Sequence, residues 1–328
     1  MRRRLFPAAT HPDGHLALVT SLNNLGSLDA DSGALADARG RYAEAVALAR
    51  RLFPPAAFPR GHEALATVLH NLGEVELLAG ATDRAEPLLR ESLAMRSRLV
   101  PSDGHAHLAQ GRQTLGRLHL ARREPAAAIA EFDAALAIAN RLERRQVAAT
   151  SEADALAYLH SRPMTRDWRL SAAPRPAEDG AAYATVWDGK ALVTRVLARR
   201  QATARLGTTD AADSLRVVEL RRRIERLMID DAPSPERDRR LADLSDESER
   251  RERDLARRVP SFARAAELER STADDLAAAL PADAVFVDAI AYDRFAPDGS
   301  ATAGQTRMRT PSYAAIVVAR GRPARRVE

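Results

Sequence analysis

Apolar residues recur at helical spacing through the first 145 residues of the chain. In one stretch a helical pattern covers residues 63–79 and ends at Gly80, and a second pattern covers residues 83–100 and ends at Pro101. Glycine ends helices because it adopts the left-handed conformation, and proline follows helices because it cannot continue them. The pattern therefore predicts two antiparallel helices joined by a short turn.

This arrangement is copied. Gly14-His15, Gly61-His62 and Gly104-His105 each precede a helical segment, with steps of 47 and 43 residues. A recurrence at this period predicts one helical unit stacked as a solenoid, with the histidines as structural residues at helix starts. Small and large side chains recur at the same steps and should interlock the two helices of each unit. The small positions are Gly26, Gly73, Gly116, Ala38, Ala85, Ala128, Ala45, Ser92 and Ala135, and the large ones are Tyr42, Leu89 and Phe132.

Residues 1–145 resemble the tetratricopeptide repeat, in the longer subclass of kinesin light chains, where a Leu-Asn-Asn-Leu segment is typical. Leu22-Asn23-Asn24-Leu25 matches that segment fully, Leu69-His70-Asn71-Leu72 has one change, and Arg112-Gln113-Thr114-Leu115 is degenerate. The resemblance implies that the first helix of each unit lines an inner wall that binds an extended peptide or a partner helix. A solvated polar face is the other interpretation. The residues that the resemblance places on this wall are Thr20, Asn23, Ser27, Thr67, His70, Glu74, Gln110, Gln113 and Arg117.

The segment Arg3-Arg4-Leu5-Phe6-Pro7 recurs 47 residues later as Arg50-Arg51-Leu52-Phe53-Pro54. In the second place it ends a second helix of a repeat. We therefore expect the chain to begin with the tail of a further repeat, at a truncated or falsely assigned start.

Residues 146–280 predict a helical connector. Helical patterns cover residues 146–160, 182–206, 211–228 and 235–258. The last two are rich in arginine and acidic residues at spacings of three and four, which predicts a solvated, ion-paired helical hairpin in preference to a nucleic-acid surface. Ser271, with Asp274 three residues later, predicts the start of a short helix that Pro281 ends.

Beyond residue 281 the period changes to two. Residues 284–292 and 312–319 read as strands, Gly321-Arg322 as a turn, and Arg325 as the start of a third strand. The first strand is apolar on both faces apart from Asp288, which predicts burial on both sides. A hairpin of this kind is not stable alone, so we expect it to belong to a larger sheet.

Three segments carry a second resemblance: the run from Val186 to Arg195, the run from Leu280 to Val285, and the strands from Tyr292 to Val317. With the repeats and the charged hairpin they resemble bacterial proteins that end in a caspase-like CHAT domain. The implied fold is mainly α: a tetratricopeptide solenoid over residues 1–145, long helices over 146–280, and over 281–328 a β-hairpin that starts an incomplete α/β caspase-like domain.

That family hydrolyses peptide bonds with a cysteine nucleophile and a histidine base. This chain has no cysteine, and all eight histidines lie at or before His160, so neither role is carried over to any residue. Ser300 and Ser312 have no histidine nearby in sequence, and we interpret Asp288 and Asp293 as edge or turn carboxylates. We expect a truncated, non-catalytic scaffold or sensor. The alternative is the regulatory and early core part of a cysteine protease whose catalytic part is encoded downstream.

Charge and composition limit the kinds of partner and ligand that the chain is expected to bind. The net charge is +5 and the 50 basic residues are interspersed with 45 acidic ones, so we do not expect nucleic-acid binding. The sequence has no signal peptide and no apolar run of about 18 residues, which favours the cytoplasm and no membrane contact. The lone His105-x-His107 lacks further ligands, so no metal and no cofactor is expected. The expected partner is a protein or peptide in the repeat groove.

Overall fold

The structure is a computed structural model of the 328-residue chain. It describes residues 10–11, 13–99, 106–149, 165–172, 180–189, 208–230, 235–260, 263–264, 267, 271–295 and 309–327.

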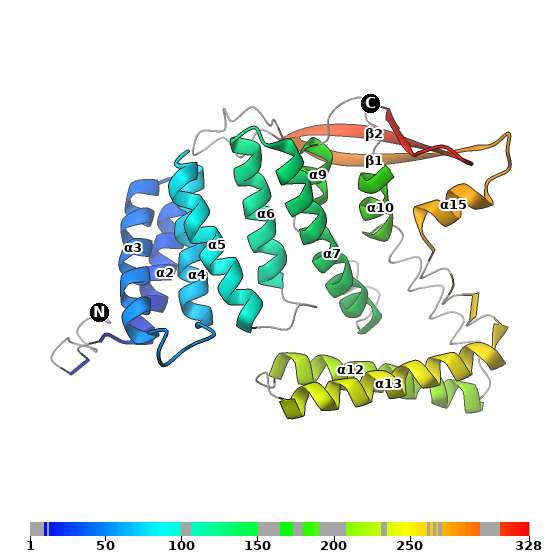
Figure 1. The fold of residues 1–328 in the computed structure, drawn as a ribbon, viewed down its shortest axis with the longest axis horizontal. Helices are drawn as coiled ribbons and strands as arrows, with labels where there is room; N and C mark the ends of the chain where they lie inside the picture. The colour runs from blue at the N-terminus through cyan, green and yellow to red at the C-terminus, as the bar shows by residue number, and fades with distance from the viewer. Residues whose placement is uncertain are drawn as a thin grey trace.

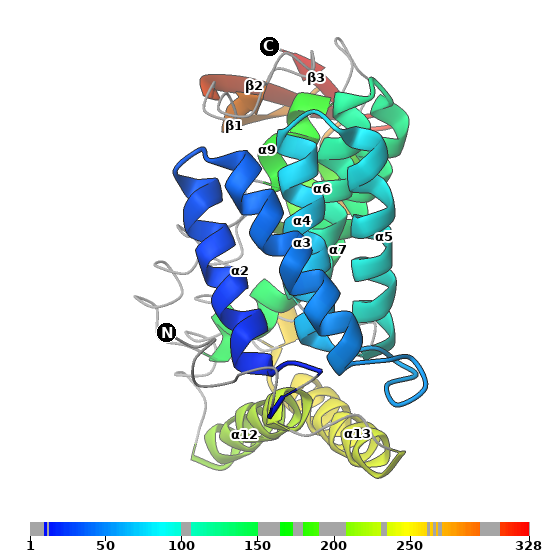
Figure 2. The ribbon, with the colours of Figure 1, turned by 90° about the vertical axis from the view of Figure 1, so that its left-hand side faces the viewer.

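Three antiparallel helix pairs form the amino-terminal half of the described chain, and they follow one behind another (Figures 1 and 2). The predicted pair over residues 63–100 is confirmed to within one residue at each helix end. His15 and His62 start α2 and α4 as predicted, because the Nδ1 atom of each accepts a hydrogen bond of 3.1 Å from the backbone N–H two residues ahead. The pairs are α2 (Leu16–Asp31) with α3 (Leu35–Leu52), α4 (Glu63–Leu78) with α5 (Thr82–Leu99), and α6 (Ala106–Ala121) with α7 (Pro125–Ala149).

Small residues on the first helix of each pair face large residues on the second, as the sequence pattern predicts. A Cβ atom built on Gly73 would lie 2.8 Å from the Leu89 side chain, and one built on Gly116 would lie 2.6 Å from the Phe132 ring. A Cβ atom built on Gly26 would lie 2.8 Å from the Tyr42 ring. The paired alanines, Ala38, Ala85 and Ala128, are fully buried. Glycine is therefore needed at these positions for close approach of the two helices.

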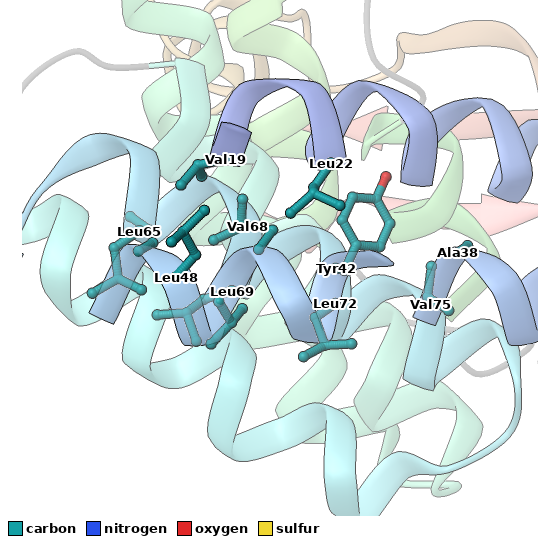
Figure 3. Packing of buried hydrophobic residues seen from close by; sticks show 14 of the residues in the cluster. Val19, Leu22, Ala38, Tyr42, Leu48, Leu65, Val68, Leu69, Leu72 and Val75 are labelled. Carbon is teal, nitrogen blue, oxygen red and sulfur yellow. The ribbon is translucent and has the colours of Figure 1, made fainter. Parts of the chain in front are cut away.

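The core is continuous across neighbouring pairs. Leu22 of α2 lies beside Tyr42 of α3, Val19 of α2 lies toward Leu48 of α3, and side chains of α4 fill the space beneath them (Figure 3). Because each pair covers the next, the apolar side chains of α4 are buried from both directions. The α4 members of this cluster are Leu65, Ala66, Val68, Leu69, Leu72 and Val75.

Helix α9 (Thr165–Ala172) continues this stacking. It packs against α7 in the way that α4 packs against α3 and α6 packs against α5, and it also touches α6. This short helix thus takes the place of the first helix of a fourth unit. Its other neighbour is strand β1 (Val285–Phe295), so α9 connects the repeats to the sheet.

The sheet has the antiparallel order β1-β2-β3, with β2 at Arg309–Ala319 and β3 at Arg325–Val327. The register pairs Val285 with Ala319 and Ala291 with Tyr313. The predicted third strand is confirmed, and Gly321 has a φ of 67° in the predicted turn. One face of the sheet packs on α9, α10 (Gly180–Gly189) and α15 (Ala273–Ala279). That core includes Leu170, Tyr183, Val186, Ile290, Tyr292, Ala314, Ile316 and Val318.

The prediction that the first strand is buried on both faces is wrong for this chain. Val285 and Val287 are 61% and 57% exposed, and Tyr313, which pairs with Ala291 further along the strand, is 76% exposed. Alternation turns Asp288 to the same face as Ile290, where it is buried and accepts a hydrogen bond of 3.1 Å from the Tyr183 hydroxyl. Asp288 thus lies on β1, at an edge of the described sheet, but its side chain is buried on the packed face and it is not a turn residue.

The start of α15 differs by one residue from the prediction. Thr272, not Ser271, caps the helix: its Oγ1 atom accepts a hydrogen bond of 3.1 Å from the Asp275 N–H. The Asp275 carboxylate in turn accepts one of 2.8 Å from the Thr272 N–H. The sequence offers two overlapping capping motifs, and the reciprocal pair forms at the second of them.

Helices α12 (Thr208–Asp230) and α13 (Pro235–Arg258) pack against each other as the predicted charged hairpin. Ion pairs follow α13 at a spacing of four, including Arg240 with Glu236 at 2.7 Å and Arg251 with Glu247 at 3.0 Å. For the predicted helix over 182–206, residues 182–189 are helical in α10 and the rest lies outside the described residues. The predicted helix over 146–160 is described as far as Ala149, within α7.

Candidate partner-binding face

The first helices of successive units contact one another: α2 touches α4, α4 touches α6, and α6 touches α9. In a solenoid the helices that approach each other in this way lie on the inner side of the curve. We call the surface that they form the first-helix face. It carries the nine residues that the resemblance places on the inner wall.

The structure gives these nine residues unequal access to a partner. A first group is open to solvent, a second is half-buried, and one residue is buried. The exposed residues are Thr20, Ser27 and Gln110; the half-buried ones are Asn23, Thr67, Glu74, Gln113 and Arg117; the buried one is His70.

Asparagines join the first two units on this face. The Asn71 side-chain amide of α4 donates a hydrogen bond of 2.8 Å to the Asn23 side-chain carbonyl of α2. Alignment of the repeats matches Asn23 with His70, so Asn71 is absent from the predicted set. The second asparagine of the Leu-Asn-Asn-Leu segment was the signal that could have identified it. This pair presents amide groups side by side across a boundary between units.

A buried arginine joins the second and third units. Arg96 of α5 is 2% exposed, and its Nε atom donates to the Glu63 carboxylate at 3.2 Å while another nitrogen donates to Thr67 Oγ1 at 3.2 Å. The same Glu63 oxygen lies 3.1 Å from Nδ1 of His107 on α6. Burial lowers the pKa of Arg96, and the Glu63 carboxylate opposes that shift. Sequence reasoning missed Glu63, Arg96 and His107, because the three come from different helices and share no spacing.

At its α9 end, the first-helix face carries a second ion pair, between Arg117 and Glu74, and the aromatic ring of Trp168. Arg117 donates to the Glu74 carboxylate at 2.7 Å, and its guanidinium lies 5.6 Å above the centre of the Trp168 ring. Beside it, the Thr165 hydroxyl donates to the side-chain carbonyl of Gln113. Three of the nine predicted residues, Glu74, Gln113 and Arg117, thus already make hydrogen bonds within the chain. The first-helix face extends onto Thr165 and Trp168 of α9, and no repeat motif in the sequence indicates these two residues.

The prediction that His70 lines the inner wall is wrong, because its side chain is buried and only 1% exposed. Burial lowers the pKa of His70 to about 4. The nearby Glu74 carboxylate raises this pKa, whereas Arg96, His107 and Arg117 lower it further. The ring is therefore neutral at pH 7, and the 3.9 Å between Nε2 and the Glu74 carboxylate is too long for a hydrogen bond. Among the described residues neither ring nitrogen has a hydrogen-bond partner.

Comparisons with known proteins agree with the repeat geometry. Residues 18–59 and residues 64–141 match sequence profiles described as tetratricopeptide repeat. The two matches cover most of the three helix pairs from α2 to α7, so this part of the chain is a tetratricopeptide-repeat region. No curated protein matches the chain.

The described part of the chain has neither a membrane-spanning helix nor a cluster of metal-binding side chains. No helix there is both long and apolar enough to cross a membrane. In the same ranges no three histidine or acidic side chains gather closely enough to hold a metal ion.

Proposed function

We propose that the chain is a protein-interaction scaffold that binds an extended segment of a partner protein along the first-helix face. Tetratricopeptide repeats generally mediate contacts between proteins, and the observation that carries the proposal is the row of polar side chains on successive first helices. Thr20 and Ser27 on α2 and Gln110 on α6 are exposed, and the Asn23–Asn71 pair lies in the same row. Amide and hydroxyl groups both donate and accept hydrogen bonds, as a peptide backbone requires.

The charges of the face favour a partner segment of low net charge. Arg96 is paired with Glu63, and Arg117 is paired with Glu74. Because each arginine already has a carboxylate, the face has no excess of positive charge with which to bind an acidic tail. Recognition would rest on hydrogen bonds to the backbone and on side-chain fit.

The test compares variants of the full chain in affinity purification with mass spectrometry. Thr20→Arg and Gln110→Arg place a long charged side chain on the face at exposed positions. Ala94→Arg is the matched control, since Ala94 is exposed on the second helix α5. We expect at least one protein to be recovered with the wild type and with Ala94→Arg and to be lost with the other two. Equal recovery by all variants would refute the proposal.

We further infer that residues 281–328 are the first strands of a CHAT-like domain and that this chain is not itself a protease. The support is the motif from Leu280 to Val285 leading into β1, the antiparallel β1–β2 pair, and the lack of any cysteine in the sequence. Peptide-bond cleavage by the purified chain, abolished by Ser312→Ala, would contradict a non-catalytic role.

A second candidate is the regulatory and early core part of a caspase-like cysteine protease. The packing of the sheet on α9 favours it, because a partner on the repeats and a catalytic domain on the sheet would then share one helix. Translation of the coding DNA downstream of Glu328 in all frames tests it. A following strand with a histidine and a cysteine would support this candidate, and the absence of both would refute it.

A further inference from the structure

The charged hairpin carries arginines in two different electrostatic situations. Helices α12 and α13 lie side by side (Figures 1 and 2), and several arginines of α13 pair with an acidic residue three or four positions earlier. By contrast, Arg223 and Arg226 of α12 have no ion-pair partner among the described residues. The paired arginines of α13 are Arg240 with Glu236, Arg251 with Glu247, Arg253 with Glu249, and Arg257 with Asp254.

The order of charges along α12 explains why these two arginines are unpaired. Glu219 stands four positions before Arg223, but it pairs with Arg216 at 3.4 Å instead. Arg226 stands four positions after another arginine, and its Nε atom donates at 3.5 Å to the backbone carbonyl of that residue, Arg222. Arg223 and Arg226 are three residues apart, so they lie on one side of the helix and repel each other. An anion bound between them would remove this repulsion.

Both arginines line a hollow between the two helices. Its volume is about 700 Å³, which lies within the roughly 300–1,000 Å³ of typical small-molecule sites. Leu227 of α12 and Leu244 of α13 are half-buried and give the hollow an apolar part. The other lining residues are Glu219, Arg240 and Asp243.

The charges of the hollow favour an anionic ligand. Glu219 and Arg240 are each paired with a neighbour on their own helix. The remaining charged groups of the hollow are the guanidinium groups of Arg223 and Arg226 and the carboxylate of Asp243, so positive charge is in excess. A planar guanidinium group presents parallel N–H donors that match the oxygens of a phosphate group.

We propose that this hollow, called the hairpin site, binds a small molecule that carries a phosphate group. The phosphate lies between Arg223 and Arg226, and the uncharged part of the ligand packs on Leu227 and Leu244. A nucleic acid fits less well, because its backbone requires a row of unpaired basic side chains and the arginines of α13 named above are paired. The proposal does not depend on the function proposed for the first-helix face.

Isothermal titration calorimetry of the full chain at low salt tests the hairpin site, with inorganic pyrophosphate and ATP as the two probes. We expect saturable binding of both probes and tighter binding of ATP, because only ATP has a nucleoside that can pack on the leucines. Arg223→Gln and Arg226→Gln should each weaken the binding of both probes about fivefold or more, since each variant removes charge-assisted hydrogen bonds to phosphate. Leu244→Ala should weaken the binding of ATP and leave that of pyrophosphate unchanged.

Arg250→Gln is the matched control. Arg250 is exposed on α13 and does not line the hairpin site, and this substitution changes the net charge by the same amount as the two test variants. It should therefore bind both probes as the wild type does. Circular dichroism melting of each variant checks that the hairpin stays folded.

Three results would count against the proposal. Absence of saturable binding of both probes would overturn it. A loss of affinity in Arg250→Gln as large as that in Arg223→Gln would also overturn it, because the probes would then respond only to the overall charge of the hairpin. Equal affinities for the two probes, unchanged in Leu244→Ala, would overturn the role of the leucines.

Discussion

The indole of Trp168 lies flat on the ring of Phe295, with ring centroids 3.8 Å apart and planes 8° from parallel. Trp168 comes from α9 and Phe295 ends β1, so the stack joins the repeat array to the sheet. Side chains of α9 also accept hydrogen bonds from the edge of β1: Asp167 from the Asp293 N–H at 3.1 Å and Ser171 from the Phe295 N–H at 2.9 Å. The edge of β1 is thereby anchored on the helix that continues the solenoid.

Replacing Trp168 should loosen this junction. We expect Trp168→Ala to cost about 2–4 kcal/mol locally, because it removes a large, partly buried ring that stacks on Phe295 and contacts the Arg117 guanidinium. Hydrogen exchange of the full chain should show faster exchange at residues 291–295, with α2 to α5 unchanged. Tyr313→Ala is the control, since that ring is exposed on the opposite face of the sheet, and it should leave these amides protected. Unchanged exchange in Trp168→Ala would contradict an anchoring role.

Two glycine substitutions should have opposite signs. Gly116→Ala places a Cβ atom 2.6 Å from the Phe132 ring, and we expect the resulting shift to cost about 1–3 kcal/mol. Gly40→Ala in α3 meets nothing within 4 Å and should stabilise the helix by up to about 1 kcal/mol. Thermal melts of both variants check this. A higher melting temperature in Gly116→Ala would show that the helix pair has room that the structure does not indicate.

Stability should fall as pH falls through the range in which His70 titrates. Its pKa is about 4 in the folded chain, lowered from 6.5 by burial, so below about pH 6.5 the unfolded chain binds more protons than the folded one. The stability that depends on the neutral ring is complete above that pH and is lost progressively down to about pH 4. The total corresponds to a few kcal/mol.

Chemical denaturation at several pH values between 7 and 4 measures this loss. His70→Gln should flatten the dependence, whereas His11→Gln, which removes a histidine near the amino terminus, should leave it as in the wild type. Identical pH profiles in the wild type and His70→Gln would assign the acid sensitivity to other groups.

The hydrogen bond from Tyr183 to Asp288 should matter for the sheet. Both residues are buried, and burial raises the pKa of Tyr183 to about 12, so its hydroxyl stays protonated and able to donate. Tyr183→Phe removes a donor from a buried carboxyl group and should cost about 1–3 kcal/mol. Tyr313→Phe changes the same atom on an exposed ring and should be close to neutral. Equal melting temperatures for the two variants would indicate that the Asp288 carboxyl is satisfied by other partners.

Much of the repeat architecture follows from the sequence. Gly26, Gly73 and Gly116 recur with their large partners because each helix pair repeats the same contact, and a local contact leaves a local pattern. The turn at Gly321 and the limits of α13 are predictable for the same reason. The burial of His70 is not, since its position in the repeat aligns with the half-buried Asn23 and the difference arises from the neighbours that α5 and α6 bring.

The sequence by itself therefore determined that helix pairs repeat, that charged helices follow, and that strands with alternating side chains close the described chain. Tertiary structure alone decided which polar residues meet: Asn23 with Asn71, Arg96 with Glu63, and Arg117 with Glu74 and Trp168. It also decided that Asp288 is buried while Val285 and Val287 are exposed. The physical reason is that hydrophobic periodicity records how one helix or strand meets its immediate neighbour. Contacts between side chains far apart in sequence depend on where the whole array places each backbone.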